Sequence, residues 1–229
     1  MSTEPLLQIT ALQRHYEMAA GTVKALDGVD ISIDAGERVI LLGPSGSGKT
    51  TLLNCIAALD TPTSGTYLFE NESVPREHSE QMTDFRRANI GYVFQFFNLL
   101  QDLTVLENIL LIQELAGQRD EARARRLLQL VGLETEVDRF PPEISGGQQQ
   151  RVAIARSLAK RPKLLLGDEL TGNLDSKTSS MVMDALVEAC DTEGITTVMV
   201  THDESLVKYA SRVIRLDSGK IVSDERVSS

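Results

Sequence analysis

The order of apolar and polar positions predicts a chain in which strands alternate with helices. Residues 39–42 are continuously apolar, as expected for a strand buried on both faces, and residues 51–58 follow with the composition of a helix. Residues 163–169 and 196–201 give two further short apolar strands. Buried strands joined by helices predict an α/β fold with a mostly parallel sheet.

The segment ahead of this core has the pattern of antiparallel strands. Residues 7–16 favour a strand, with a loop expected through Gly21, and residues 29–33 alternate strictly between apolar and polar, as in a strand with one solvated face. Residues 71–75 are expected to be loop, and residues 213–222 have the pattern of a closing hairpin. We therefore expect an antiparallel β subdomain beside the parallel core.

The middle of the chain is predicted to be helical. Residues 104–116 and 119–131 repeat apolar positions at helical spacing. This change of pattern predicts an inserted α-helical subdomain at about 96–160, with the core in about 5–95 and 160–229.

Several side chains on the predicted helices have plain structural interpretations. The polar side of the second predicted helix should face solvent with Arg123, Arg125 and Arg126. Farther along, apolar residues at helical spacing predict core positions at Met181, Val182 and Leu186. Cys55 is expected to be a small buried helix residue rather than a reactive thiol.

Composition narrows the classes of protein that fit. The 229 residues suit one large domain or a domain with an insertion, and a hydrophobic content of 41% supports a sizeable core. No apolar run approaches the ~20 residues needed to span a bilayer, and the polar start, residues 1–5, does not resemble a secretory signal. A formal net charge of −10 argues against a nucleic-acid surface. The two cysteines fit a reducing compartment, so we expect a soluble chain facing the cytosol.

One glycine-rich stretch fits the phosphate-binding pattern G-x-x-x-x-G-K-[ST], and it lies between a predicted strand and a predicted helix, as the motif requires. Its glycines let backbone N–H groups turn toward phosphate oxygens, and the positive end of the helix adds to the attraction. The Lys can reach the β- and γ-phosphates, and the hydroxyl after it can bind Mg²⁺. We therefore predict a nucleotide site formed by Gly43, Pro44, Ser45, Gly46, Ser47, Gly48, Lys49, Thr50 and Thr51.

A second glycine-rich stretch precedes a helix expected at about 149–160. It consists of Ser145, Gly146, Gly147 and Gln148. A serine able to cap, two glycines and a helix N-terminus again favour an anion. A simple glycine-rich cap is the alternative interpretation, and the context that follows favours a second anion site.

Polar side chains follow three of the predicted strands. Asp168 and Glu169 end one strand, and because neighbouring strand residues point to opposite sides, Asp168 can face Mg²⁺ while Glu169 faces an attacking water. Gln95 ends another predicted strand, residues 90–94, and can bind a metal or position water. His202 follows a third strand and can contact the γ-phosphate. Tyr16 is either an aromatic that stacks on adenine or an aromatic of the core.

Together these features resemble the ATP-binding-cassette (ABC) ATPases over nearly the whole chain. The motifs occur in family order: the Walker A loop at 43–50, the Q-loop Gln95, the signature at 145–148, the Walker B Asp168 with Glu169, the D-loop Asn173, Leu174 and Asp175, and the switch His202. The resemblance implies a P-loop NTPase core with an antiparallel β subdomain and an α-helical subdomain. It also implies a head-to-tail dimer, in which ATP lies between the Walker A loop of one copy and the signature of the other.

The resemblance assigns roles to these residues as well. It implies that Tyr16 stacks on adenine, that Glu169 is the general base, and that Lys49 and His202 act on the phosphates. It implies Mg²⁺ ligands at Thr50, Gln95 and Asp168. One departure is Leu170, which stands where the family usually has Pro; loss of the fixed φ of Pro would loosen the turn that places Glu169.

Four segments, 59–65, 96–100, 103–108 and 171–177, resemble the branch that contains lipoprotein-release, macrolide-export and cell-division ATPases. The implied protein is a peripheral ATPase on the cytoplasmic side of the inner membrane, partnered by transmembrane permease subunits and a second copy of itself. Its complex would export or extract lipid, lipoprotein, drug or peptide. The alternative is an ATP-switched module that drives a membrane partner mechanically without transport. A soluble ABC protein of repair or translation would carry two cassettes or long coiled coils, which this chain does not show.

Overall fold

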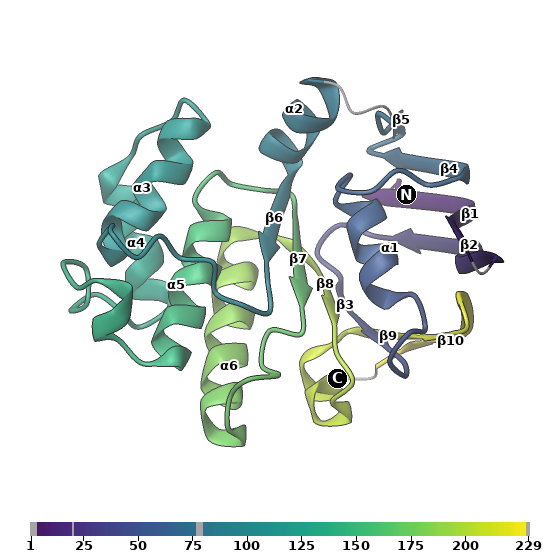
Figure 1. Ribbon diagram of the computed structural model, residues 1–229. Coiled ribbons are helices and arrows are strands. Elements are labelled where there is room, and N and C mark those ends of the chain that lie inside the picture. Colours follow the sequence, from purple (N-terminus) through teal and green to yellow (C-terminus); the bar gives the residue numbers. More distant parts are fainter. Residues whose placement is uncertain (1–3, 20, 77–79, 228–229) are drawn as a thin grey trace. The chain divides into compact units, whose positions relative to one another are not determined.

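The strand predicted from the run of apolar residues lies in the middle of a sheet. In the computed structural model, which describes residues 4–19, 21–76 and 80–227, this strand is β3 (Arg38–Leu42) and its four apolar side chains are buried. Parallel strands β8 (Thr196–Val200) and β9 (Arg212–Asp217) pair with β3 on either side, and β10 (Lys220–Arg226) pairs antiparallel with β9 (Figure 1). The predicted closing hairpin is confirmed.

A second, antiparallel sheet is formed by strands that come before and after β3 in the sequence. Its strands, in the order β2-β1-β4-β5, are β1 (Leu7–Met18), β2 (Gly21–Ile33), β4 (Ser64–Phe69) and β5 (Glu72–Ser73). The predicted antiparallel subdomain is thereby confirmed, with two differences. Gly21 opens β2 instead of ending a loop, and the segment expected to be loop contains the short β5, which pairs with β4.

The contacts divide the chain into two compact units. The first contains the described residues up to 86 and from 196 onward, and the second contains residues 87–195. The first also holds α1 (Lys49–Ile56), which packs against β8 and β2, and a 3₁₀ helix at Glu204–Tyr209. The narrower helical insertion, predicted at about 96–160, stays a prediction.

The second unit combines a pair of parallel strands with a group of helices. β6 (Ile90–Val93) runs parallel to β7 (Leu164–Asp168), with Val93 beside Gly167. The helices pack on one another and are α3 (Val105–Leu115), α4 (Glu121–Leu130), α5 (Gly146–Leu158) and α6 (Ser176–Glu193) (Figure 1). A 3₁₀ turn at Pro141–Glu143 leads toward α5, and α2 (Glu80–Asn89) leads into β6.

Two predictions about helix faces are wrong in part. Arg123 is buried at 7% exposure, because its guanidinium pairs with Glu193 of α6, whereas Arg125 is exposed and pairs with Glu121 on its own helix. Met181 is 50% exposed, while Val182 and Leu186 are fully buried as expected. Both cysteines are buried thiols, as expected for Cys55.

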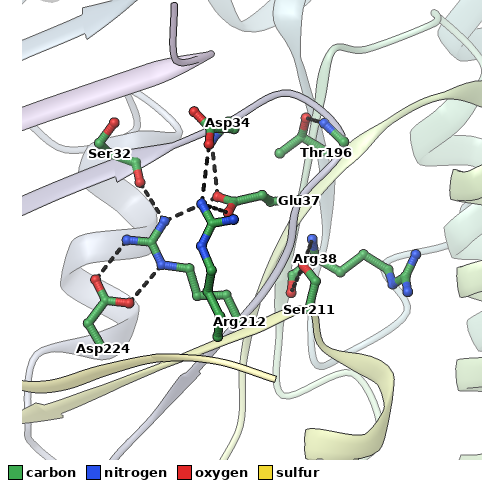
Figure 2. Close-up of polar contacts among 10 residues, drawn as sticks. Ser32, Asp34, Glu37, Arg38, Thr196, Ser211, Arg212 and Asp224 are labelled. Atoms are coloured by element: carbon green, nitrogen blue, oxygen red, sulfur yellow. Dashed lines mark hydrogen bonds and ion pairs between the residues drawn. The ribbon is translucent and has the colours of Figure 1, made fainter. Parts of the chain in front are cut away.

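A polar network holds the turn that leads into β3. Arg212 of β9 forms a bidentate pair with Asp224 of β10, at 2.7 Å for each contact, and donates to the carbonyl of Ser32 at the end of β2 (Figure 2). It also contacts Glu37, at 3.1 Å. At the same turn the Arg38 N–H donates to Ser211. These contacts join the two sheets of the first unit and fix the start of the strand that carries the glycine-rich loop.

None of the helices in the described parts of the chain is both long and apolar enough to cross a membrane.

Candidate active site

The glycine-rich loop after β3 requires glycine at two positions for different contacts. A Cβ on Gly43 would lie 2.1 Å from the carbonyl oxygen of Leu216, and a Cβ on Gly48, which has φ 101°, would lie 2.3 Å from the carbonyl oxygen of Ala25. Backbone therefore approaches the loop so closely that no side chain fits. Between these glycines the Ser47 hydroxyl is buried without a hydrogen-bond partner among the described residues.

The helix that begins after this loop, α1, starts differently from α3, α4, α5 and α6. The N-cap Gly48 provides no side-chain hydrogen bond, whereas side chains cap α3, α4, α5 and α6. The first amides of a helix have no acceptor within the helix, and the N-cap Gly48 has no side chain that could supply one. The Lys49 ammonium lies over the loop and donates to the carbonyls of Gly43 and Pro44, at 2.8 Å each. A glycine-capped helix start next to a buried ammonium suits a polyphosphate.

His202 lies at the same sheet edge as this loop. β8 runs parallel to β3, and the Thr201 N–H donates to the carbonyl of Leu41 at 3.2 Å. The chain therefore leaves β8 beside the place where β3 passes into the loop, and the His202 side chain is exposed there. His202 therefore lies at the edge of the sheet from which the loop also leaves.

Tyr16, on β1, is half-buried and is not part of the hydrophobic core. Its hydroxyl donates to the carboxylate of Asp60 at 2.5 Å, and the guanidinium of Arg14 lies 4.3 Å from the centre of its ring. Burial, together with the hydrogen bond to Asp60, raises the pKa of the Tyr16 hydroxyl. The interpretation of Tyr16 as a core aromatic is therefore the weaker of the two.

The second unit brings three predicted residues to one strand edge. Gln95 follows β6 and Asp168 ends β7, and these strands are parallel neighbours. A Cβ placed on Gly172 would lie 3.7 Å from the side-chain nitrogen of Gln95 and 3.8 Å from Cβ of Glu169, so both side chains border the same turn. The Gly172 N–H donates to the carbonyl of Glu169 at 3.1 Å. Burial, with a smaller effect of the Asp168 carboxylate, raises the pKa of Tyr92 beside them.

The second glycine-rich stretch is a capped helix start. The Ser145 hydroxyl accepts from the Gln148 N–H at 3.3 Å, and the Gln148 side chain accepts from the Ser145 N–H at 2.9 Å. The helix α5 therefore begins at Gly146, three residues earlier than predicted. The cap expected from the simpler interpretation is present, and Gly146 and Gly147 supply the remaining amides of the first turn.

The D-loop residue Asp175 is linked to this stretch through one threonine. Asp175 caps α6 and accepts from the Thr178 hydroxyl at 2.6 Å, and these bonds from Thr178 lower the pKa of the Asp175 carboxyl. A Cβ on Gly147 would lie 2.3 Å from the methyl carbon of Thr178. A side chain at Gly147 would overlap Thr178 of α6, the residue whose hydroxyl donates to Asp175. This close packing explains why the position is glycine.

The structure thus forms two groups of candidate residues, one in each unit. The first unit holds Tyr16, the loop Gly43 to Thr51 and His202; the second holds Gln95, Ser145 to Gln148, Asp168, Glu169 and Asp175. Within the described residues no cluster of three or more His, Cys, Asp or Glu side chains could hold a metal ion. Mg²⁺ does not require such a cluster, because it binds through substrate phosphates, water and one or two protein oxygens.

Comparison with known proteins agrees with this geometry. The family model described as "ABC transporter" matches residues 26–172, which is more than half of the chain. The chain belongs to the ABC transporter ATP-binding family. It is an ABC-type ATPase with the α/β cassette fold.

Individual relatives place this ABC ATPase within one branch. The lipoprotein-releasing system ATP-binding protein LolD of Geobacter metallireducens is 45% identical over 222 residues, covering 96% of this chain and 99% of the relative. The macrolide export ATP-binding/permease protein MacB 1 of Aeromonas hydrophila is 41% identical over 226 residues, which cover 97% of this chain but 35% of that longer protein. The suspected branch is therefore confirmed.

A solved cassette has the same fold. The dimeric structure of the ATP-binding cassette MJ0796 in a post-hydrolysis state, bound to ADP and Pi, has a TM-score of 0.86 at 38% identity, covering 97% of this chain and 99% of that one. As a member of the ATP-binding family, the chain described here accordingly binds ATP.

Sequence reasoning missed two residues at the site. Arg14 and Asp60 contact Tyr16 directly. One signal was present for Arg14, because residues two apart on a strand share a face. No local pattern connects Asp60 to Tyr16, since 44 positions separate them.

Proposed function

We propose that this chain is the ATP-hydrolysing subunit of a LolD- or MacB-type membrane complex, and that ATP closes two copies of it head to tail. The observation that carries the proposal is the contrast between its helix starts: α1 follows the phosphate-type loop without a side-chain cap, whereas α3, α4, α5 and α6 all have one. A helix start that follows such a loop and has glycine at its N-cap suits the phosphates of a nucleotide.

ATP binds with its phosphates on the loop from Gly43 to Thr51 and its base against Tyr16. Lys49 moves from the loop carbonyls to the β- and γ-phosphates. Thr50, Asp168 and Gln95 would be the ligands of Mg²⁺, which would supply positive charge against the phosphates; hydroxyl, carboxylate and amide oxygens are the ligands it prefers.

Three side chains are proposed to act in hydrolysis. Glu169 accepts a proton from the water that attacks the γ-phosphate, Gln95 orients that water, and His202 donates a hydrogen bond to the γ-phosphate. Gln95 and Glu169 border the same turn at Gly172, which supports a shared task at the water.

The second copy completes the site. The signature residues Ser145 to Gln148 offer the amides of Gly146 and Gly147 at the start of α5 to the γ-phosphate of ATP bound by the partner copy. The dimeric state of the similar cassette MJ0796 supports this arrangement.

The membrane partner binds the segment after β6. Phe94, Phe96 and Leu100 are 40%, 68% and 48% exposed, an apolar content that is unusual for solvent-facing loop residues. Arg156 of α5 holds the same segment through the carbonyls of Phe97 and Asn98, at 3.1 and 2.6 Å. A permease helix bound to this segment would be coupled through Arg156 to α5, the helix that begins with the signature residues.

The complex exports or extracts lipid, lipoprotein, drug or peptide, and the chain works at the cytoplasmic face of the inner membrane. The names of the LolD and MacB relatives favour this over a purely mechanical drive of a division-type partner. A nucleic-acid partner is not part of the proposal, because the net charge is −10.

The test is affinity capture from solubilised native membranes with ATP and Mg²⁺, using the tagged Glu169→Gln chain to prolong the ATP-bound state. We expect a permease with few transmembrane helices and a large outer domain to be recovered with it. The matched control is Glu188→Gln, an exposed carboxylate on α6, which should hold the partner no better than the wild type. Recovery of soluble proteins alone would contradict the proposal.

A further inference from the structure

Two charged side chains outside the nucleotide-binding motifs form a planar pair beside Tyr16. The guanidinium of Arg14 donates through Nε to Oδ2 of Asp60 at 2.9 Å, and through Nη2 to Oδ1 at 2.7 Å. Both side chains are about one quarter exposed, at 24% and 22%. A bidentate pair of this kind fixes the orientation of both partners as well as their distance.

Tyr16 makes two contacts with this pair. Its hydroxyl donates to Oδ2 of Asp60 at 2.5 Å, and one face of its ring lies against the Arg14 guanidinium at 4.3 Å. Oδ1 of the same carboxylate also accepts from the Thr61 N–H at 2.8 Å. The carboxylate therefore has donors on both oxygens, and the ring of Tyr16 is held at its edge and on one face.

The position of Asp60 connects the ring to the phosphate loop. Asp60 lies just beyond the end of α1, and its N–H donates to the carbonyl of Asn54 in that helix, at 3.2 Å. The segment that follows is bound to β1, because the Thr63 N–H donates to the carbonyl of Gln13 at 2.7 Å. One end of α1 therefore carries the phosphate-binding turn, and the other end holds the hydroxyl of Tyr16.

We propose that Arg14 and Asp60 are positioning residues that fix the Tyr16 ring for stacking on the base of the nucleotide. This inference rests on the proposed function, since it takes ATP as the ligand of the site. Arg14 occupies one ring face and leaves the other to the base. Because the hydroxyl is engaged by Asp60, recognition uses the ring face alone, and stacking does not distinguish one purine from another. The Tyr16 contact accordingly does not favour ATP over GTP.

The test compares ligands with and without a base. Dissociation constants are measured for MgATP and for magnesium tripolyphosphate with the wild type, Asp60→Asn, Tyr16→Phe and the double variant. Asp60→Asn and Tyr16→Phe should each weaken ATP binding by roughly three- to tenfold, a part of the stacking energy, and leave tripolyphosphate binding unchanged. The double variant should be no weaker than the weaker single variant, because both changes act on the one contact between Asp60 and the Tyr16 hydroxyl.

The matched control is Thr22→Ala, which removes a hydrogen bond to Glu17 in the same hairpin without contact to Tyr16; its ATP affinity should equal that of the wild type. Equal loss of ATP and tripolyphosphate binding in Asp60→Asn, or additive losses in the double variant, would overturn the positioning role. Tyr16→Ala removes the stacking ring itself. If the ratio of ATP to tripolyphosphate affinity were unchanged in that variant, the ring would not bind the base, and the positioning role would be overturned too. A wild type that binds tripolyphosphate but hydrolyses no ATP would instead count against the proposed function.

Discussion

The side chain of Leu170 fills the space that a side chain on Gly167 would need. A Cβ built on Gly167 would lie 2.8 Å from Cδ1 and 2.9 Å from Cγ of Leu170, and Leu170 is itself buried at 6% exposure. Between them Glu169 has φ 48°, a left-handed conformation that costs energy for a residue with a side chain. Leu170 therefore anchors the turn by packing on Gly167, which offsets the missing Pro constraint at this position.

Gly167→Ala should disturb this turn. The added methyl overlaps Leu170, and overpacking of this kind lowers the free energy of unfolding by about 1–3 kcal/mol. ATP hydrolysis should fall as well, because the displaced Leu170 moves the adjacent Glu169. Denaturant unfolding and steady-state ATPase rates measure the two effects.

A double variant separates overlap from a general loss of stability. Leu170→Ala alone removes a buried side chain at a cost of about 2–5 kcal/mol. In Gly167→Ala/Leu170→Ala the new methyl occupies part of the vacated space, so the combined loss should be smaller than the sum of the single losses. Strictly additive losses would show that the two residues do not compete for one space.

Glu169→Gln should separate binding from chemistry. The amide keeps the size of the carboxylate but cannot accept the proton of the attacking water, so hydrolysis should slow by roughly 10²–10⁴-fold, the usual range for general-base catalysis. Affinity for ATP should persist, because the proposed phosphate contacts lie on the loop from Gly43 to Thr51. Single-turnover hydrolysis and ATP binding are compared with the Glu188→Gln control, and near-normal turnover in Glu169→Gln would remove Glu169 from the role of base.

Two glycines of the phosphate loop provide a matched pair for a third test. Gly46 and Gly48 both have positive φ, 78° and 101°, so Ala at either position carries backbone strain. A Cβ on Gly46 would meet no atom within 4 Å, whereas one on Gly48 would meet the Ala25 carbonyl at 2.3 Å. Gly48→Ala should therefore lower both the unfolding temperature and ATP affinity more than Gly46→Ala. Equal effects would mean that backbone strain alone, rather than overlap with the Ala25 carbonyl, makes glycine necessary at these positions.

Much of this architecture could be predicted because its causes are local. The apolar run of β3, the glycine-lysine turn and the carboxylates after β7 are each set by neighbours in sequence, and the parallel register then brings the strand ends to shared edges. What could not be predicted depends on partners distant along the chain. The spacing on α4 indicated a solvated Arg123, and only the approach of Glu193, 70 positions away, shows that it is buried.

The Arg123–Glu193 pair supports a fourth prediction. Arg123 donates to Glu193 at 2.7 Å and to the carbonyl of Leu158 at 3.1 Å, which joins α4 to the ends of α5 and α6. Glu193→Gln leaves the Arg123 charge buried with a weaker partner, and breaking a buried pair costs roughly 3 kcal/mol or more. The control is Glu121→Gln: the Arg125–Glu121 pair is 49% and 50% exposed, so its loss should cost at most ~0.5 kcal/mol. Equal losses in the two variants would contradict the structural role of Arg123.

The environment of Cys55 predicts a pH dependence. Burial, with a smaller effect of the Asp60 carboxylate, raises the pKa of the Cys55 thiol to about 12, whereas a cysteine in an unfolded chain titrates near 8.5. Above pH ~8.5 the unfolded chain therefore loses a proton that the folded chain keeps. The stabilisation is fully present below that pH and is lost as the pH rises toward about 12.

The predicted fall in the free energy of unfolding with rising pH can be measured on a chain that keeps Cys55 as its single thiol. In a Cys190→Ala background, the free energy of unfolding should fall between pH 8 and about 10, within the window that the Cys55 pKa defines. Adding Cys55→Ala should reduce that dependence, since the contribution of this thiol is gone. Native Cys55 should also react with an alkylating reagent at pH 8.5 far more slowly than the unfolded chain does, because the thiolate is the nucleophile. Rapid labelling of the native chain at that pH would show that the thiol is neither buried nor protonated as its surroundings in α1 require.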